Sequence, residues 1–114
     1  MSENEERPWG RYEVIGGEAS HKIKRIWISS GKQLSYQRHK FRAEHWFVIA
    51  GSGIAIVDGH EITITVGSSL DIAIGQLHRI RNTGNTDLIF IEVQTGTYFG
   101  EDDIVRVEDD FGRA

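Results

Sequence analysis

The chain has 114 residues, 13 basic and 17 acidic side chains, a formal net charge of −4 and no cysteine. This length favours one compact domain over residues 1–114, because two domains of ordinary size would not fit. The net negative charge argues against nucleic acid or an anionic membrane as a partner. The absence of cysteine excludes disulfides and thiolate metal sites, so any metal must be held by His, carboxylate, amide or water.

The N-terminal ten residues, MSENEERPWG, are polar and acidic. A signal peptide needs a basic start followed by an apolar run, and this segment has neither. No stretch approaches the about 20 apolar residues of a membrane span. The sequence therefore predicts a cytoplasmic protein.

Short apolar runs separated by glycines predict an all-β fold, since Gly occurs 13 times and Pro once and helical periodicity is almost absent. In EITITV, alternation places Ile62, Ile64 and Val66 on one face. DGHE at 58–61 predicts a tight hairpin, because Asp-Gly favours turns with positive φ. The expected strands are Arg11–Ile15, Lys22–Ser29, Gln33–Arg38, Glu44–Ala50, Gly53–Val57, His60–Val66, Ser69–Ile74, His78–Asn82 and Asp87–Thr95.

The C-terminal segment, GEDDIVRVEDDFGR, has a mixed pattern. A short helical turn and an extended arm both remain open. Its apolar anchors would be Ile104, Val105, Val107 and Phe111. We interpret GEDD at 100–103 as an ordinary charged turn without a catalytic part.

Three potential metal ligands lie within eight residues of one another. Gln37 and His39 are two apart, so both point to one face of an extended strand. A turn over residues 40–43 would bring Glu44 back to the same side, and His78, at the start of a later strand, is the best-placed fourth ligand. Taken alone, such a histidine is more often structural than metal-binding. The spacing of the set is what favours a metal site.

Two spaced motifs resemble those of the cupins. The first, residues 31–51, reads Gly31, five residues, Gln37, Arg38, His39, four residues, Glu44, six residues, Gly51, with Gln in place of the first His of the family. The second, residues 67–82, reads Gly67, five residues, Ala73, Ile74, Gly75, two residues, His78, three residues, Asn82, with Ala where Pro is usual. Fifteen residues separate them.

This resemblance implies a single cupin barrel, also called a double-stranded β-helix or jelly roll. It also implies one divalent metal ion bound by Gln37, His39, Glu44 and His78. A mixed nitrogen and oxygen set suits zinc, manganese, iron, cobalt or nickel, and the sequence does not choose among them.

A narrower resemblance covers nearly the whole chain. The segments RPWG, LSYQRHKFRAEHW, HRIRN and IEVQTGTYFGEDDIVRVEDDFGR are similar to the isomerase domain at the C-terminal end of bifunctional mannose-6-phosphate isomerase/mannose-1-phosphate guanylyltransferases. In that family Gln is usual at the first ligand position. The resemblance implies interconversion of mannose 6-phosphate and fructose 6-phosphate, which feeds nucleotide-sugar and polysaccharide synthesis. No segment resembles the Gly-rich nucleotide loop of the guanylyltransferase half, so guanylyl transfer is not expected.

Aldose–ketose isomerisation moves a proton between neighbouring carbons and develops an oxyanion, which a metal can stabilise. Glu92 is the leading candidate base because it alternates with apolar Ile91 and Val93 on the last long strand. His45, which has the opposite parity from Glu44, is the alternative. The resemblance ties Arg42 to isomerase function, with a solvated turn arginine as the other interpretation.

A phosphate group also needs cations, and Lys24, Lys40 and Arg79 are the candidates for substrate binding. Alternation places Arg79 and Arg81 on the face opposite His78. At least one of these two arginines is therefore expected at the surface or in a dimer contact.

Two other functions remain open. The first is a non-catalytic metal-containing cupin that binds a sugar or sugar phosphate, and the second is an iron-dependent cupin oxygenase. Gln37 and the narrower resemblance favour sugar chemistry over the oxygenase. A homodimer is expected in each case, because a small barrel leaves strand edges and an apolar outer face to cover.

Overall fold

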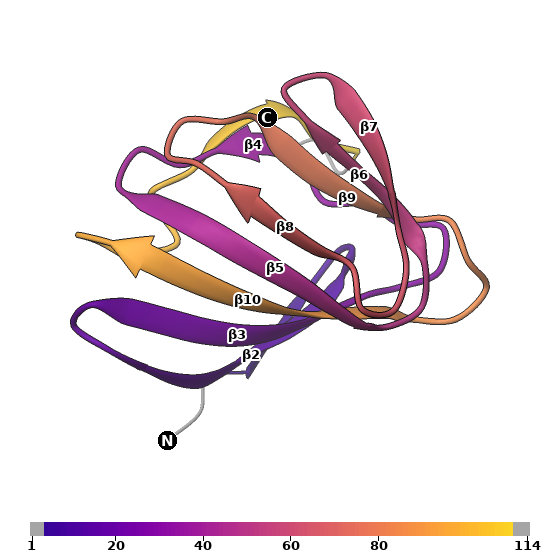
Figure 1. Cartoon of the computed structure of the whole chain (residues 1–114), viewed down its shortest axis with the longest axis horizontal. Helices are drawn as coiled ribbons and strands as arrows, with labels where there is room; N and C mark the ends of the chain where they lie inside the picture. The colour runs from indigo at the N-terminus through magenta and orange to yellow at the C-terminus, as the bar shows by residue number, and fades with distance from the viewer. Residues whose placement is uncertain (1–3, 111–114) are drawn as a thin grey trace.

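Residues 4–110, which the computed structural model describes, form two antiparallel sheets and no helix (Figure 1). The expected all-β architecture is confirmed. In spatial order the six-stranded sheet contains β1 (Asn4–Arg7), β2 (Gly10–Glu18), β3 (His21–Ile28), β10 (Leu88–Gly96), β5 (Arg42–Ala50) and β8 (Ser69–Ile72). The five-stranded sheet contains β11 (Val105–Glu108), β4 (Tyr36–Arg38), β9 (His78–Asn82), β6 (Gly53–Val57) and β7 (His60–Ile64).

The inward face of the six-stranded sheet is apolar at one end and polar at the other. Along β10, inward residues change from Leu88 and Phe90 to Glu92 and Gln94, and all four are buried. Antiparallel pairing aligns this change with the neighbouring strands. On β3, Ile28 and Ile26 pair with Leu88 and Phe90, and Lys24 pairs with Glu92. On β5 the change comes one inward residue later, because Val48 pairs with Phe90, Trp46 with Glu92 and Glu44 with Gln94.

The apolar half of the barrel stabilises the fold and the polar half can carry chemistry. Side chains from both sheets fill the apolar half, among them Ala55, Ile64 and Ile80, which are at most 1% exposed. Complete burial of one large aliphatic side chain contributes about 1.5–3 kcal/mol to folding. The charges buried in the polar half are tolerated because they are paired with one another, as Arg42 is with Glu44 and Lys24 with Glu101.

The predicted hairpin at DGHE is confirmed. Val57 pairs with His60, so Asp58 and Gly59 form a two-residue loop. Their φ angles are 47° and 83°. Positive φ at both positions matches the twist of the flanking strands.

Several predicted strand ends are wrong, and one strand was not predicted. The strand expected to reach Val66 ends at Ile64, because Thr65 and Ser68 form a hydrogen-bonded turn that leaves Val66 61% exposed. The next strand ends at Ile72 rather than Ile74. The strand expected over Gln33–Arg38 is regular only over Tyr36–Arg38, with an isolated bridge from Gln33 to Arg81. Near the N-terminus, Asn4–Arg7 adds an unpredicted edge strand beside β2.

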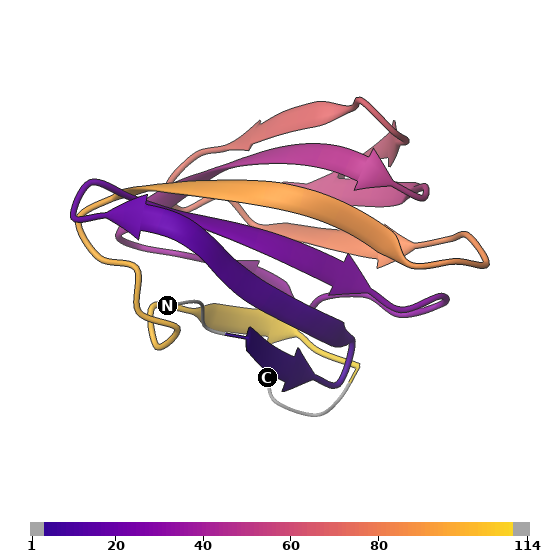
Figure 2. The ribbon, with the colours of Figure 1, turned by 90° about the horizontal axis from the view of Figure 1, so that it is seen from below.

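Of the two possibilities for the C-terminal segment, the structure has the extended arm. The chain leaves the end of β10, forms a loop over residues 97–104 and enters β11, which pairs with β4 (Figure 2). Phe111 lies outside the described residues. Within residues 4–110 no helix has the length and apolar character needed to cross a membrane.

Candidate metal centre

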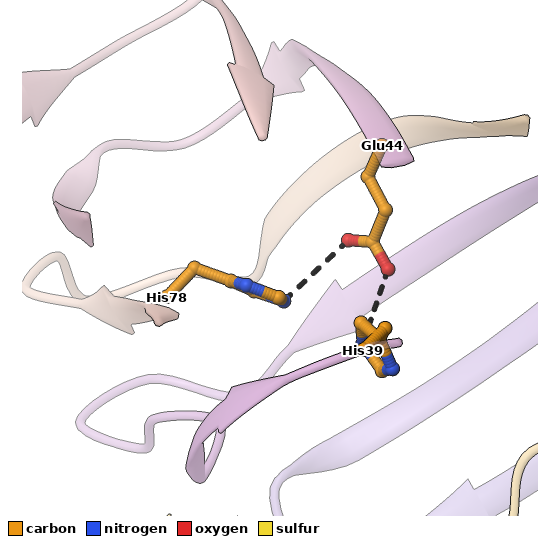
Figure 3. Close-up of side chains that lie close together, drawn as sticks. All are labelled: His39, Glu44 and His78. Atoms are coloured by element: carbon orange, nitrogen blue, oxygen red, sulfur yellow. Dashed lines mark ion pairs between the residues drawn. The ribbon is translucent and has the colours of Figure 1, made fainter. Parts of the chain in front are cut away.

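His39, Glu44 and His78 meet inside the polar half of the barrel (Figure 3). One potential ligand atom from each lies within 4.8 Å of the other two. The His39 Nε2 atom is 3.2 Å from Glu44 Oε2, and the His78 Nε2 atom is 3.7 Å from Glu44 Oε1. All three side chains are buried, so the carboxylate lies between two imidazoles away from bulk water.

Both sheets contribute to this cluster. His39 directly follows β4, Glu44 lies on β5 in the opposite sheet, and His78 begins β9. Gln37 is the partner of His78 in the β4–β9 pairing, and its side chain lines the same cavity. The structure thus brings the four predicted ligands to one cavity, and coordination by the Gln37 amide stays a prediction.

Each histidine is oriented with its Nε2 atom towards Glu44. The His39 Nδ1–H donates to the backbone carbonyl of Asp103, and the His78 Nδ1–H donates to that of Gln76 at 2.9 Å. A carbonyl can only accept, so the proton lies on Nδ1 and the lone pair on Nε2. Burial and the Arg42 charge lower the pKa of His39 to about 4, and burial lowers the pKa of His78. Both rings are neutral at neutral pH, as metal binding requires.

The donor set fits a divalent cation. Two neutral imidazoles and one buried carboxylate, with the Gln37 amide close by, form the mixed nitrogen and oxygen set that zinc, manganese, iron, cobalt and nickel accept. The Trp46 Nε1–H donates to Glu44 Oε1 at 3.0 Å and orients the carboxylate. Such outer partners raise the affinity of a site because they hold its ligands in place.

Glu92 lies beside this cluster with an unusual protonation equilibrium. Burial, followed by the nearby Glu44 carboxylate, raises the pKa of Glu92 to about 7. Its Oε1 accepts from Trp46 Nε1–H at 3.2 Å, and its Oε2 accepts from the Gln94 amide at 2.6 Å. Glu92 therefore shares the Trp46 donor with Glu44 and can exist in either protonation state near neutral pH.

Two buried cations line the same cavity. Arg42 Nε donates to Glu44 Oε2 at 3.0 Å, and Arg42 Nη2 is 3.1 Å from His39 Nε2. The Lys24 ammonium donates to Glu101 Oε2 at 2.7 Å and lies 4.1 Å from the centroid of the Tyr12 ring. The interpretation of Arg42 as a solvated turn residue is wrong, because its side chain is only 6% exposed.

Three other predicted site residues lie elsewhere. Arg79 Nε donates to the Leu34 carbonyl, Lys40 is exposed in the β4–β5 turn, and His45 faces outward. The His45 ring pairs with Asp71 at 2.7 Å on that outer face. None of these three lines the cavity of the His39, Glu44 and His78 cluster, so the geometry does not support a role for them in its chemistry.

The sequence analysis missed Glu101 and Asp103, which it placed in an ordinary charged turn. The Asp103 carboxylate accepts from the backbone N–H groups of Lys40 and Phe41, each at 2.9 Å, and its carbonyl orients His39. Glu101 reaches Lys24 and Arg42. The density of acidic residues in GEDD was the available signal, but it did not indicate these distant partners.

Comparison with solved structures defines the class of fold. The capsular polysaccharide assembling protein CapF from Staphylococcus aureus aligns with a TM-score of 0.78 at 20% identity, over 96% of this chain and 35% of that chain. An RmlC-like cupin from Shewanella frigidimarina aligns with a TM-score of 0.75 at 21% identity, over 90% and 88%. The fold is a cupin barrel, as the two motifs predicted.

Sequence comparison assigns the chain to a narrower family within this fold. Residues 1–109 match the family described as mannose-6-phosphate isomerase C-terminal, and the chain belongs to this family. It is 41% identical over 107 residues to a mannose-1-phosphate guanylyltransferase of Klebsiella pneumoniae, covering 94% of this chain and 23% of that protein. It is also 45% identical over 108 residues to the xanthan biosynthesis protein XanB of Xanthomonas campestris pv. campestris, covering 94% and 23%. The chain thus spans less than a quarter of the length of either relative.

Proposed function

We propose that the chain is a metal-dependent isomerase that interconverts mannose 6-phosphate and fructose 6-phosphate and supplies polysaccharide synthesis. Family membership supports this proposal, as do relatives named for mannose 1-phosphate and xanthan chemistry. The observation that carries it is the presence of Glu92, a buried carboxyl with a pKa of about 7, in the same cavity as the His39, Glu44 and His78 cluster. This combination provides a proton-transfer group beside a candidate metal centre.

Gln37, His39, Glu44 and His78 would hold one divalent ion. When bound, the ion would supply electrostatic stabilisation of the negative charge that develops on the sugar oxygens. Glu44 would remain oriented by Trp46, and each histidine by its carbonyl partner. These contacts fix the orientation of the ligands in the absence of substrate.

Glu92 would carry the proton. As a carboxylate it accepts the proton from C2 of the aldose, and as the carboxylic acid it returns that proton to C1, while the proton of the C2 hydroxyl passes to the C1 oxygen to give the ketose. A pKa near the working pH makes both directions accessible. We assign this role to Glu92 rather than His45, because the His45 side chain is 47% exposed on the outer face.

Arg42 and Lys24 would bind the anionic part of the substrate. Arginine offers a planar fork of donors and lysine a compact charge, and both bind phosphate oxygens. Both side chains are buried and line the cavity, whereas Lys40 is exposed and Arg79, although buried, lies outside the cavity. Arg42 could also contact a sugar oxygen, because it lies against Glu44.

A second candidate function is binding of a sugar phosphate without turnover. The buried cations Lys24 and Arg42 favour it, because they supply charge for a phosphate group without requiring any proton transfer. The deciding experiment loads the purified chain with each candidate metal and measures consumption of fructose 6-phosphate in a coupled assay. Turnover that depends on metal supports the isomerase, and binding of mannose 6-phosphate without turnover supports the second function.

We also propose that two copies associate through the outer face of the six-stranded sheet. Phe47 and Ile49 are 44% and 40% exposed on β5 and point away from the core. Exposed apolar side chains of this size favour association. Sedimentation velocity should give the mass of a dimer, and Phe47→Lys should shift it to that of a monomer.

A further inference from the structure

The loop between β10 and β11 places an acidic side chain on the two buried cations of the cavity. Glu101 Oε2 accepts from Lys24 Nζ at 2.7 Å and lies 3.4 Å from Arg42 Nη1. The Lys24 and Arg42 side chains are 3% and 6% exposed, whereas that of Glu101 is 42% exposed. One carboxylate from a surface loop therefore neutralises two cations that belong to the barrel wall.

The two cations are held more firmly than their acidic partner. Lys24 lies on β3 between Val14 of β2 and Glu92 of β10, and Arg42 begins β5. Glu101 lies on neither sheet. Within residues 4–110, the hydrogen bond of the Lys24 ammonium goes to Glu101. A buried ammonium without an acceptor is strongly unfavourable, so Lys24 needs an anion at this position, whereas Arg42 is also paired with Glu44.

Release of Glu101 would not require movement of the contacts that orient His39. Asp103 is anchored, because its carboxylate accepts from the backbone N–H groups of Lys40 and Phe41 and its carbonyl from His39. Glu101 and Asp102 are exposed and precede this anchor. Movement limited to the short segment before Asp103 would free the cations and leave His39 in place.

We propose that Lys24 and Arg42 form a subsite for a phosphate group, and that the Glu101 carboxylate occupies this subsite until phosphate displaces it. This inference rests on the proposed sugar-phosphate function. A phosphate monoester carries a charge of about −1.5 to −2 near neutral pH and more acceptor oxygens than a carboxylate, so it can satisfy both donors at once. Its entry also removes Glu101 from the cavity, which enlarges the space available to the sugar.

The test compares phosphate affinity in two variants that lose the same charge. Glu101→Gln keeps the shape of the side chain but gives up the carboxylate that binds Lys24 and Arg42. Asp102→Asn is the matched control, because Asp102 is the next residue and its contact is with the Tyr98 hydroxyl. Isothermal titration of the folded, metal-loaded full chain with inorganic phosphate gives the affinities, and thermal unfolding verifies that each variant is folded.

Glu101→Gln should bind phosphate roughly tenfold more tightly, which corresponds to about 1.4 kcal/mol, and Asp102→Asn should bind it as the unmodified chain does. Lys24→Met added to Glu101→Gln should remove the gain. An equal gain in both single variants would reduce the effect to net charge and overturn the proposal. Unchanged or weaker binding by folded Glu101→Gln would also overturn it.

Parallel titrations with mannose 6-phosphate and mannose separate charge competition from simple obstruction. The gain in Glu101→Gln should appear with mannose 6-phosphate and not with mannose, and an equal gain with mannose would overturn the subsite. Turnover is not part of this measurement. A chain with the expected phosphate pattern and no isomerisation would refute the proposed enzyme alone, whereas an active isomerase with unchanged phosphate affinity would refute the subsite alone.

Discussion

Arg42 and Glu44 form a buried ion pair through an atom that is also a candidate metal ligand. Arg42 Nε donates to Glu44 Oε2 at 3.0 Å, and the same oxygen lies 3.2 Å from His39 Nε2. Arg42 Nη2 in turn lies 3.1 Å from that histidine nitrogen. A metal bound through His39 would compete with the guanidinium for the one lone pair of that nitrogen, so Arg42 is a neighbour of the candidate metal site rather than a distant surface charge.

Replacement of Arg42 by Ala should spare metal binding and impair turnover. The guanidinium lies beside the metal ligands but is not one of them, so its loss removes no atom that would bind the metal. Loss of one charge-stabilising donor typically lowers kcat about 10²–10³-fold. Emission spectroscopy measures the metal content, and the coupled assay measures kcat. A loss of metal would instead indicate that Arg42 is needed to hold Glu44 in place.

Replacement of His39 or His78 by Ala should abolish metal content while the barrel stays folded. The apolar cluster around Ile28, Ile80 and Phe90 is retained, and we expect the free energy of unfolding of the metal-free chain to fall by only about 1–3 kcal/mol. Metal analysis combined with urea unfolding in the presence of a chelator measures both effects. His45→Ala is the control, since its side chain lies on the outer face. Full metal content in His39→Ala or His78→Ala would refute the proposed metal site.

Replacement of Glu92 by Gln should lower kcat and leave the metal bound. The substitution preserves an oxygen that can accept from Trp46, but it removes the group that exchanges a proton. General acid–base groups typically contribute about 10²–10⁴-fold to the rate. Assays at saturating substrate, with metal content measured on the same samples, would show whether the loss lies in the chemical step. Unaltered kcat would assign the base to another residue.

The raised pKa of Glu92 predicts a pH-dependent stability term. Its ordinary value is 4.5 and its value in the folded chain is about 7, so the folded state binds more protons than the unfolded state between these values. The stabilising contribution of the protonated carboxyl is therefore complete below pH 4.5 and is lost as the pH rises towards 7.

The stability contribution of His39 depends on pH in the opposite direction. Its pKa is lowered to about 4, so the unfolded state takes up the proton first as the pH falls. The difference between the chain and Glu92→Gln isolates the Glu92 term. Urea unfolding of both metal-free proteins should show that the chain loses stability relative to the variant from pH 4.5 to 7. A constant difference across this range would contradict the pKa assignment.

Much of this site could be predicted because its ligands lie in spaced motifs on short strands. Two-residue periodicity placed Gln37 and His39 on one face, and the tight Asp58–Gly59 turn followed from local backbone preference. Strand ends at Ile64 and Ile72 were less predictable. Apolar Val66 and Ile74 extend the pattern, but each lies inside a hydrogen-bonded turn that ends the strand before it.

By itself the sequence determined the all-β class, the cupin motifs and the four candidate ligands, since each depends on the spacing of residues within short segments of the chain. Tertiary structure decided which charges meet inside the barrel. Lys24 is 77 residues from Glu101, and His39 is 64 residues from Asp103. Alternation shows which face a side chain occupies, but only strand register and the return of the chain through β11 determine its partner. The ordinary-looking turn GEDD thus became the segment that orients His39 and neutralises the cations of the cavity.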